Sequence, residues 1–125
     1  MDSRQVLTTF NNHFLEFVND IQQVFPNDVD ISTIHNAFTK MRKANPKLIM
    51  MTFKEHVLEP YRKEIETGDI EFFISKDYRQ DVGNNNMILE KIDCLRGPIR
   101  EMNTEEQKKV VKYLQNLCKL CDLYK

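Results

Sequence analysis

The chain has 125 residues, of which 41% are hydrophobic and 30% are charged, and its formal net charge is −1 at pH 7. A chain of this length buries about two thirds of its unfolded surface, so we expect a single domain over residues 1–125. The scarcity of glycine and proline excludes a turn-rich β sandwich, and no stretch approaches the roughly 20 apolar residues of a membrane span. Three cysteines without framework spacing favour a reducing compartment over a secreted scaffold.

The first two predicted helices each carry one apolar stripe. The first covers residues 3–25, with Asp2 or Ser3 as its cap and a proline directly after it. The side chains of its stripe recur at three- and four-residue steps: Val6, Phe10, Phe14, Phe17, Ile21 and Val24. The second helix covers about residues 31–44, and Asp30 is expected to cap it.

A third helix is predicted to begin at Pro46 and to end at Gly68, where glycine can adopt the left-handed conformation of a helix C-cap. Its apolar row, at four-residue spacing, consists of Ile49, Phe53, Val57, Tyr61 and Ile65. Pro60 lies inside that row and has no N–H for the carbonyl of His56. We therefore expect a kink, or two abutting helices, near residues 56–59.

Residues 69–78 fit two patterns. Asp69 as a cap with Glu71 in the first turn favours a helix, whereas the alternation of Ile70, Phe72 and Ile74 also suits a strand. A lone strand would have no partner in this chain, so a helix is preferred. The polar residues 81–86 that follow are predicted to form a loop.

The last third of the chain predicts two more helical segments. A helix from Met87 to about Leu95 is expected to be interrupted by Gly97-Pro98. The final helix runs from Thr104 to Tyr124, with a capping box over Thr104 to Gln107 and one continuous apolar face. Together these segments predict an all-α fold, an irregular bundle of five to six helices with a kinked central helix.

Catalytic, metal and nucleotide-binding motifs are not evident in the sequence. Cys118 and Cys121 form a C-x-x-C pair, which is typical of zinc or redox sites, and Cys94 would be a third ligand. However, the pair lies deep in a predicted helix, where two cysteines fill an apolar face, and the three histidines are scattered. We therefore predict no enzyme activity, no cofactor and no metal site.

The charges form bands along the chain. Residues 39–54 contain five basic residues and no acidic one, whereas residues 55–106 are acidic. The sequence also holds more consecutive apolar residues than one narrow helix face can bury, as in Ile49-Met50-Met51, Phe72-Phe73 and Val110-Val111. From these features we predict a protein-binding surface made of Lys40, Arg42, Lys43, Lys47, Phe72 and Phe73. Nucleic acid is the less favoured partner, because a dedicated nucleic-acid binder is usually basic overall.

Three segments carry a resemblance to a known group of proteins. They are EPYRKEIETGDIEFFISKDY (Glu59–Tyr78), LRGPIREM (Leu95–Met102) and KYLQNLCKLCDLYK (Lys112–Lys125). The chain resembles short helical open reading frames of large double-stranded DNA viruses of algae and protists, closely in its second half and loosely in its first. The resemblance implies a virus-encoded protein of the virion or of the cytoplasm of an infected host cell. It assigns no activity and no role to any residue.

Together, the sequence predicts a helical protein–protein interaction module. The resemblance implies a minor structural (virion or capsid) or assembly protein of a large DNA virus. Its partners would be other protein chains, either viral structural proteins or further copies of itself. The alternative is a small viral regulator that binds a host or viral protein or a nucleic acid.

Overall fold

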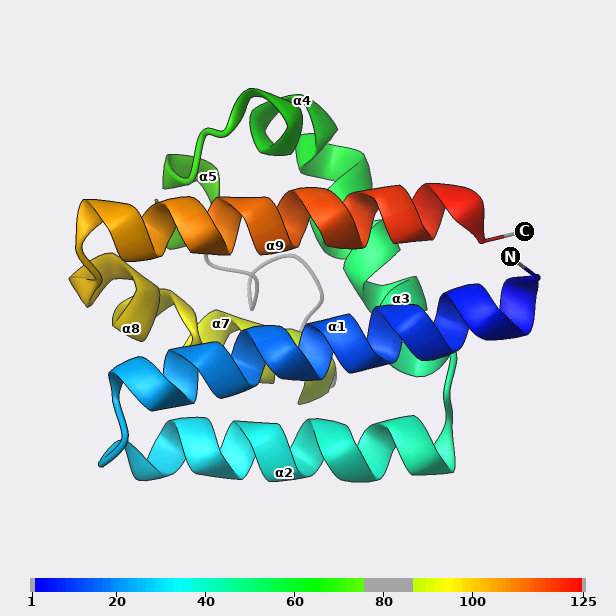
Figure 1. Ribbon diagram of the computed structural model, residues 1–125, viewed down its shortest axis with the longest axis horizontal. Coiled ribbons are helices and arrows are strands. Elements are labelled where there is room, and N and C mark those ends of the chain that lie inside the picture. The colour runs from blue at the N-terminus through cyan, green and yellow to red at the C-terminus, as the bar shows by residue number, and fades with distance from the viewer. Residues whose placement is uncertain (1, 76–86, 125) are drawn as a thin grey trace.

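The computed structural model describes residues 2–75 and 87–124, which form an irregular helical bundle (Figure 1). The described residues contain helices and no strand, so the predicted all-α fold is confirmed. The elements are α1 (Ser3–Val24), α2 (Val29–Ala44), α3 (Leu48–Phe53), the π-helical η1 (Lys54–Leu58), α4 (Glu59–Thr67), α5 (Glu71–Ser75), α7 (Met87–Cys94), α8 (Arg96–Glu101) and α9 (Thr104–Leu123). The predicted loop at residues 81–86 lies outside the described residues.

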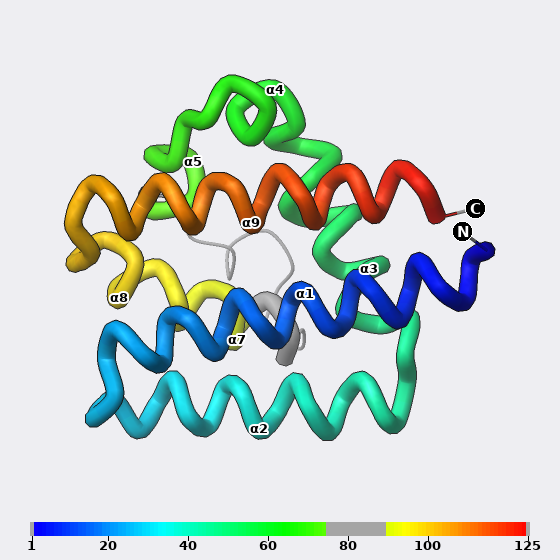
Figure 2. Tube along the Cα trace, viewed as in Figure 1, coloured from blue at the N-terminus to red at the C-terminus, as the bar shows by residue number. Residues whose placement is uncertain are grey.

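Helix α1 lies at the centre of the bundle, between α2 and α9. Figures 1 and 2 show the three long helices side by side, with α1 antiparallel to both neighbours. As a result the start of α1, the end of α2 and the end of α9 lie at one end of the molecule. The turn between α1 and α2, together with α8 and the start of α9, lies at the opposite end. This arrangement decides which surface residues become neighbours.

The core is built around the phenylalanines of α1. Phe10 and Phe14 are almost completely buried, and the ring of Phe14 lies 4.8 Å from that of Phe38 in α2, centroid to centroid, in an edge-to-face arrangement. Phe10 meets Phe53 of α3 at 5.7 Å. Edge-to-face pairs of this kind add about 0.5–1.5 kcal/mol each to the free energy of burial. The predicted apolar stripe is thus buried from Val6 to Ile21, whereas its last predicted member, Val24, is 37% exposed, so its assignment to the stripe was wrong.

Of three helix starts, α1 has a cap that the sequence predicted, whereas the caps of α2 and α9 differ from the prediction. Asp2 caps α1 through the backbone N–H of Gln5, at 2.8 Å. Asp28, and not Asp30, caps α2, since its carboxylate accepts from the N–H groups of Asp30 and Ile31. The capping box of α9 is Asn103 with Glu106 and not the box predicted from Thr104 to Gln107. The observed cap lies two residues before the predicted one in α2 and one residue before it in α9.

The central helix bends without ending, as predicted for Pro60. It begins at Leu48, two residues after the predicted start, and continues through η1 and α4 to Gly68, which is left-handed with φ +81°. The N–H of Glu59 reaches back five residues to the carbonyl of Lys54, which makes a π-turn directly before Pro60. A second irregularity falls at Tyr61, whose backbone is non-helical. The predicted position at residues 56–59 overlaps the π-turn, whereas the non-helical backbone lies one residue after the proline, outside that range.

Residues 71–75 are helical, which decides between the helix and strand patterns for that part of the segment, whereas residues 76–78 lie outside the described residues. The carbonyl of Ile74 accepts hydrogen bonds from Arg96 Nε at 3.0 Å and from Arg100 Nη2 at 2.8 Å, so that α8 is tied to α5. Gly97 and Pro98 do not interrupt a helix, because they lie in the first turn of α8, where a proline loses no hydrogen bond. The break comes earlier, at Leu95.

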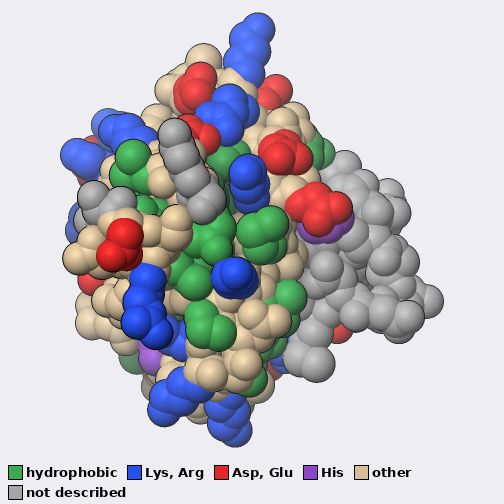
Figure 3. All heavy atoms as spheres, turned by 90° about the vertical axis from the view of Figure 1, so that its right-hand side faces the viewer, with side chains coloured by type: hydrophobic (Ala, Val, Ile, Leu, Met, Phe, Trp, Pro, Cys, Tyr) green, Lys and Arg blue, Asp and Glu red, His purple; other side chains and the backbone are tan. Residues whose placement is uncertain are grey.

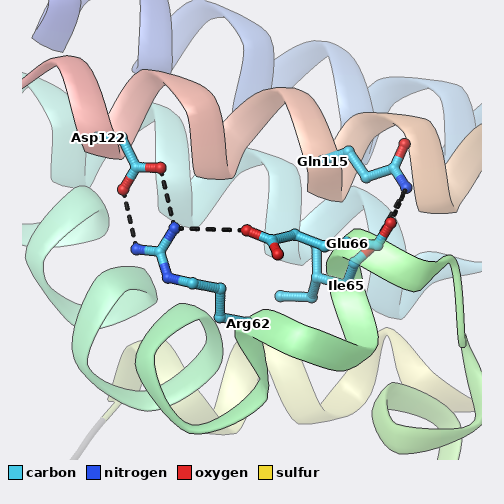
Figure 4. Close-up of polar contacts among 5 residues, drawn as sticks. All are labelled: Arg62, Ile65, Glu66, Gln115 and Asp122. Carbon is cyan, nitrogen blue, oxygen red and sulfur yellow. Dashed lines mark hydrogen bonds and ion pairs between the residues drawn. The ribbon is translucent and has the colours of Figure 1, made fainter.

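Helix α4 lies against α9 through polar contacts as well as apolar ones (Figure 4). Gln115 Nε2 of α9 donates to the carbonyl of Ile65 at 3.1 Å, close to the end of α4. Arg62 of α4 pairs with Asp122 near the end of α9. These contacts connect the middle of the chain to its last helix.

Candidate docking surfaces

The predicted basic residues lie together at one end of the molecule, where α2 ends and α3 begins (Figure 1). Lys40, Lys43 and Lys47 are exposed, and none of them joins an ion pair within the described residues. Arg42 is half-buried and donates from Nη1 to Asn12 Oδ1 at 2.7 Å. Three of the four predicted cations are therefore free to meet a charged partner.

The turn between α2 and α3, which carries Lys47, is held by α1. Asn11 is 2% exposed, and its Nδ2 donates to the carbonyl of Pro46 at 2.9 Å. Within the turn, Asn45 Oδ1 accepts from the backbone N–H of Lys47 at 3.3 Å. The buried amide fixes the position from which Lys47 and Leu48 project, so this surface is built on the rigid core.

Apolar side chains are exposed next to the cations. Leu48 is 41% exposed, Met51 48% and Leu123, at the end of α9, 56%. Figure 3 views this end directly and shows apolar side chains near its centre with lysine and arginine side chains around them, and with acidic side chains among these in the upper part of the view. We call this surface the basic end, defined by Lys40, Arg42, Lys43, Lys47, Leu48, Met51 and Leu123. An apolar centre with a charged rim is the usual organisation of a protein-binding surface.

A hollow of about 320 Å³ lies between the C-terminal half of α1 and the N-terminal half of α9, toward the other end of the molecule. Its lining is half apolar and half polar. The apolar residues are Phe17, Ile21, Val24, Met102 and Val110, and the polar ones are Asp20, Gln23, Glu106, Lys109 and Tyr113. Two carboxylates and one ammonium group thus line the hollow. Tyr113 Oη donates a hydrogen bond to Asp20 Oδ2, and burial, followed by this hydrogen bond, raises the pKa of Tyr113 well above its usual range.

The predicted aromatic pair does not adjoin the basic residues. Figures 1 and 2 place α5, which carries Phe72 and Phe73, far from the end of α2. Phe73 is 1% exposed and belongs to the core, so its predicted place on an accessible surface is wrong. Phe72 is half-buried and stacks on Tyr61, with 5.1 Å between the ring centroids. Only Phe72 retains some accessible surface, and it is separate from the basic end.

Cys118 and Cys121 are 5% and 1% exposed, in the core formed by α9. Desolvation is the main reason that the pKa of each thiol is raised to about 12. Within residues 2–75 and 87–124, no three His, Cys, Asp or Glu side chains gather in a way that could hold a metal ion. The two thiols are therefore placed as core side chains.

The sequence indicated only some of the exposed apolar residues of this surface. The triplet of residues 49–51 signalled that one side chain would be left out of the core, and that side chain is Met51. The exposure of Leu123 had no comparable signal, because it depends on where α9 ends relative to α3.

No family model matches the chain, and no solved structure matches it. Among the described helices, none combines the length and the apolar character needed to cross a membrane.

Proposed function

We propose that the protein is a helical protein–protein interaction module that binds an acidic protein surface through its basic end. The observation that carries the proposal is that Leu48, Met51 and Leu123 are exposed at the same end of the bundle as Lys40, Lys43 and Lys47, which join no ion pair among the described residues. Apolar side chains gain free energy when a partner removes them from water, and the surrounding lysines steer and orient a negatively charged partner.

The apolar content of the basic end favours protein over nucleic acid as the partner. Nucleic-acid affinity comes mostly from cationic contacts to phosphates, and exposed Leu48 and Met51 add nothing to it. The near-neutral total charge points the same way. The resemblance of the second half of the chain to small proteins of large DNA viruses would make this module a minor structural or assembly protein of such a virus.

Photo-crosslinking from the basic end tests the proposal. Met51 is replaced by a photoreactive phenylalanine analogue in the cells that make the protein, and Asn36, exposed in the middle of α2, is replaced in a parallel control. We expect one discrete protein adduct from position 51 and none from position 36. Lys47→Glu should weaken the affinity for that protein at least tenfold, and Lys63→Glu, at an exposed lysine of α4, should not.

The proposal fails if position 51 gives no adduct, if both positions give the same adducts, or if the two charge reversals act alike. An adduct with nucleic acid in place of protein would assign the regulator function instead.

A further inference from the structure

The exposed apolar side chains of the protein gather at its two ends. In the described part of the chain, the large hydrophobic residues that are exposed are Val24, Val29, Leu48, Met51 and Leu123. The last three belong to the basic end. Val24 and Val29 flank the turn between α1 and α2, at the opposite end of the long axis (Figure 1). Among the side chains whose exposure the structure describes, residues 2–74 and 90–124, such residues lie at both ends of the bundle and not along its long sides.

The two ends carry opposite charge. Val29 follows Asp28 and precedes Asp30 in the sequence, and Val24 lines the hollow that Asp20 and Glu106 also line. We call this surface the acidic end, defined by Asp20, Val24, Asp28, Val29, Asp30 and Glu106. Lys109 also faces the hollow and partly offsets its charge. The basic end presents Lys40, Lys43 and Lys47 without a partner among the described residues.

We propose that the basic end of one copy docks on the acidic end of the next, so that the protein assembles head to tail. This inference rests on the proposed function and names its partner as a second copy of this chain. Each end supplies what the other requires: the apolar residues on both ends are buried together, and the lysines of one meet the carboxylates of the other.

The hollow at the acidic end suits the insertion of a flexible apolar side chain. Phe17, Ile21 and Val110 line the hollow and are buried. The exposed side chain of Met51 or Leu48 of the next copy would insert there. Methionine adapts to an irregular pocket because its side chain is unbranched and polarizable. Because the two contacting surfaces differ, the contact does not close on itself as a two-fold dimer would, and it leads to rings or open chains.

Light scattering of the purified protein at increasing concentration tests this inference. We expect the mass to rise from the 14.9 kDa monomer past the dimer, and 1 M salt to reverse the increase, because the screening length falls from about 10 Å at 0.1 M to about 3 Å. The basic-end variant Lys43→Glu/Lys47→Glu and the acidic-end variant Val24→Ser/Val29→Ser should each remain monomeric. Lys63→Glu is the control and should assemble as the unmodified protein does. Helical circular dichroism verifies that every variant is folded.

Mixing the two assembly-deficient variants distinguishes head-to-tail contact from every symmetric arrangement. Each variant retains one intact end, so an equimolar mixture should form dimers and nothing larger. The inference is overturned if the unmodified protein stays monomeric or stops at a dimer. It is also overturned if the mixture of the two variants forms no dimer. If the protein stays monomeric while Met51 still crosslinks to a different protein, the head-to-tail inference fails and the proposed function stands.

Discussion

The guanidinium of Arg62 donates hydrogen bonds to both carboxylate oxygens of Asp122, from Nη1 to Oδ2 and from Nη2 to Oδ1, each at 2.9 Å (Figure 4). The two residues are 60 positions apart, so the pair fastens α4 to the last turns of α9. The Arg62 partner lowers the pKa of Asp122, chiefly through the hydrogen bond. The bond thus contributes to the position of the C-terminal end of α9, where Leu123 is exposed.

Breaking this pair should have a small, pH-dependent effect on stability. Both side chains are partly exposed, at 41% and 50%, so Asp122→Asn should cost at most about 1 kcal/mol in the free energy of unfolding at pH 7. Since the folded-state pKa of Asp122 is lowered, the contribution is present above the unfolded pKa near 4 and is lost as the pH falls through the folded value. Urea unfolding at pH 7 and pH 3 measures it. Equal destabilisation of the variant at both pH values would contradict the assignment.

Replacing Tyr113 with phenylalanine should remove a contact that joins α1 to α9. The hydroxyl donates to Asp20, so Tyr113→Phe should destabilise the protein by about 1–2 kcal/mol, because the carboxylate loses its donor. The raised pKa of Tyr113 means that the hydrogen bond contributes fully below the unfolded pKa near 10 and is lost as the pH rises above it. Unfolding by urea at pH 8 and pH 10.5 should show a steeper decline in the unmodified protein than in Tyr113→Phe. Tyr124→Phe serves as a control, and a matching loss in that variant would refute the prediction.

Asn11 should matter more than its neighbour Asn12. Asn11→Ala removes a buried hydrogen bond to Pro46 and leaves that carbonyl without the amide, which should cost about 1–3 kcal/mol. Asn12→Ala removes only an exposed contact to Arg42 and should cost little. Thermal unfolding gives both values. At temperatures where both variants are folded, Asn11→Ala should also weaken binding at the basic end, because the turn that carries Lys47 loses its hydrogen bond to α1. An unchanged binding affinity would show that this hydrogen bond is not needed.

The three cysteines should differ in their reactivity toward iodoacetamide. Cys94 is exposed, whereas Cys118 and Cys121 are buried and the pKa of each of these two thiols is raised to about 12. The thiolate is the reactive form, so at pH 8 the native protein should be modified rapidly at Cys94 alone and at all three positions in denaturant. Mass spectrometry of time points distinguishes the sites. Rapid modification of Cys118 or Cys121 in the native protein would show that these thiols are accessible.

The long helices were predictable because their apolar side chains repeat over many turns. The row from Val6 to Ile21 and the row from Val110 to Cys121 both face the core as their spacing predicts. The kink at Pro60 was predictable for a similar reason, since a missing N–H has a fixed consequence in any helix. These features are decided locally, within one element.

The features that could not be predicted from the sequence depend on contacts between segments that are far apart in the chain. Phe72 and Phe73 are consecutive, and only the packing of α5 against its neighbours decides that Phe73 enters the core while Phe72 stacks on Tyr61. Likewise, nothing near Val29 indicates that it lies at the same end as the hollow between α1 and α9, because that proximity follows from the antiparallel arrangement of α1, α2 and α9. The basic band was visible as a run of charge, but its apolar neighbour Leu123 is contributed from the other end of the chain.

Amide chemical shifts recorded during dilution test the central claim most directly, because they report which residues take part in contacts between molecules. On dilution of isotopically labelled protein from millimolar to micromolar concentration, the largest shift changes should fall on Lys47, Leu48 and Met51 at one end and on Val24 and Val29 at the other. Exposed residues in the middle of the long sides, such as Asn36 and Lys63, should not change. Concentration-dependent changes centred on Phe72, or spread evenly over the surface, would contradict docking through the two ends.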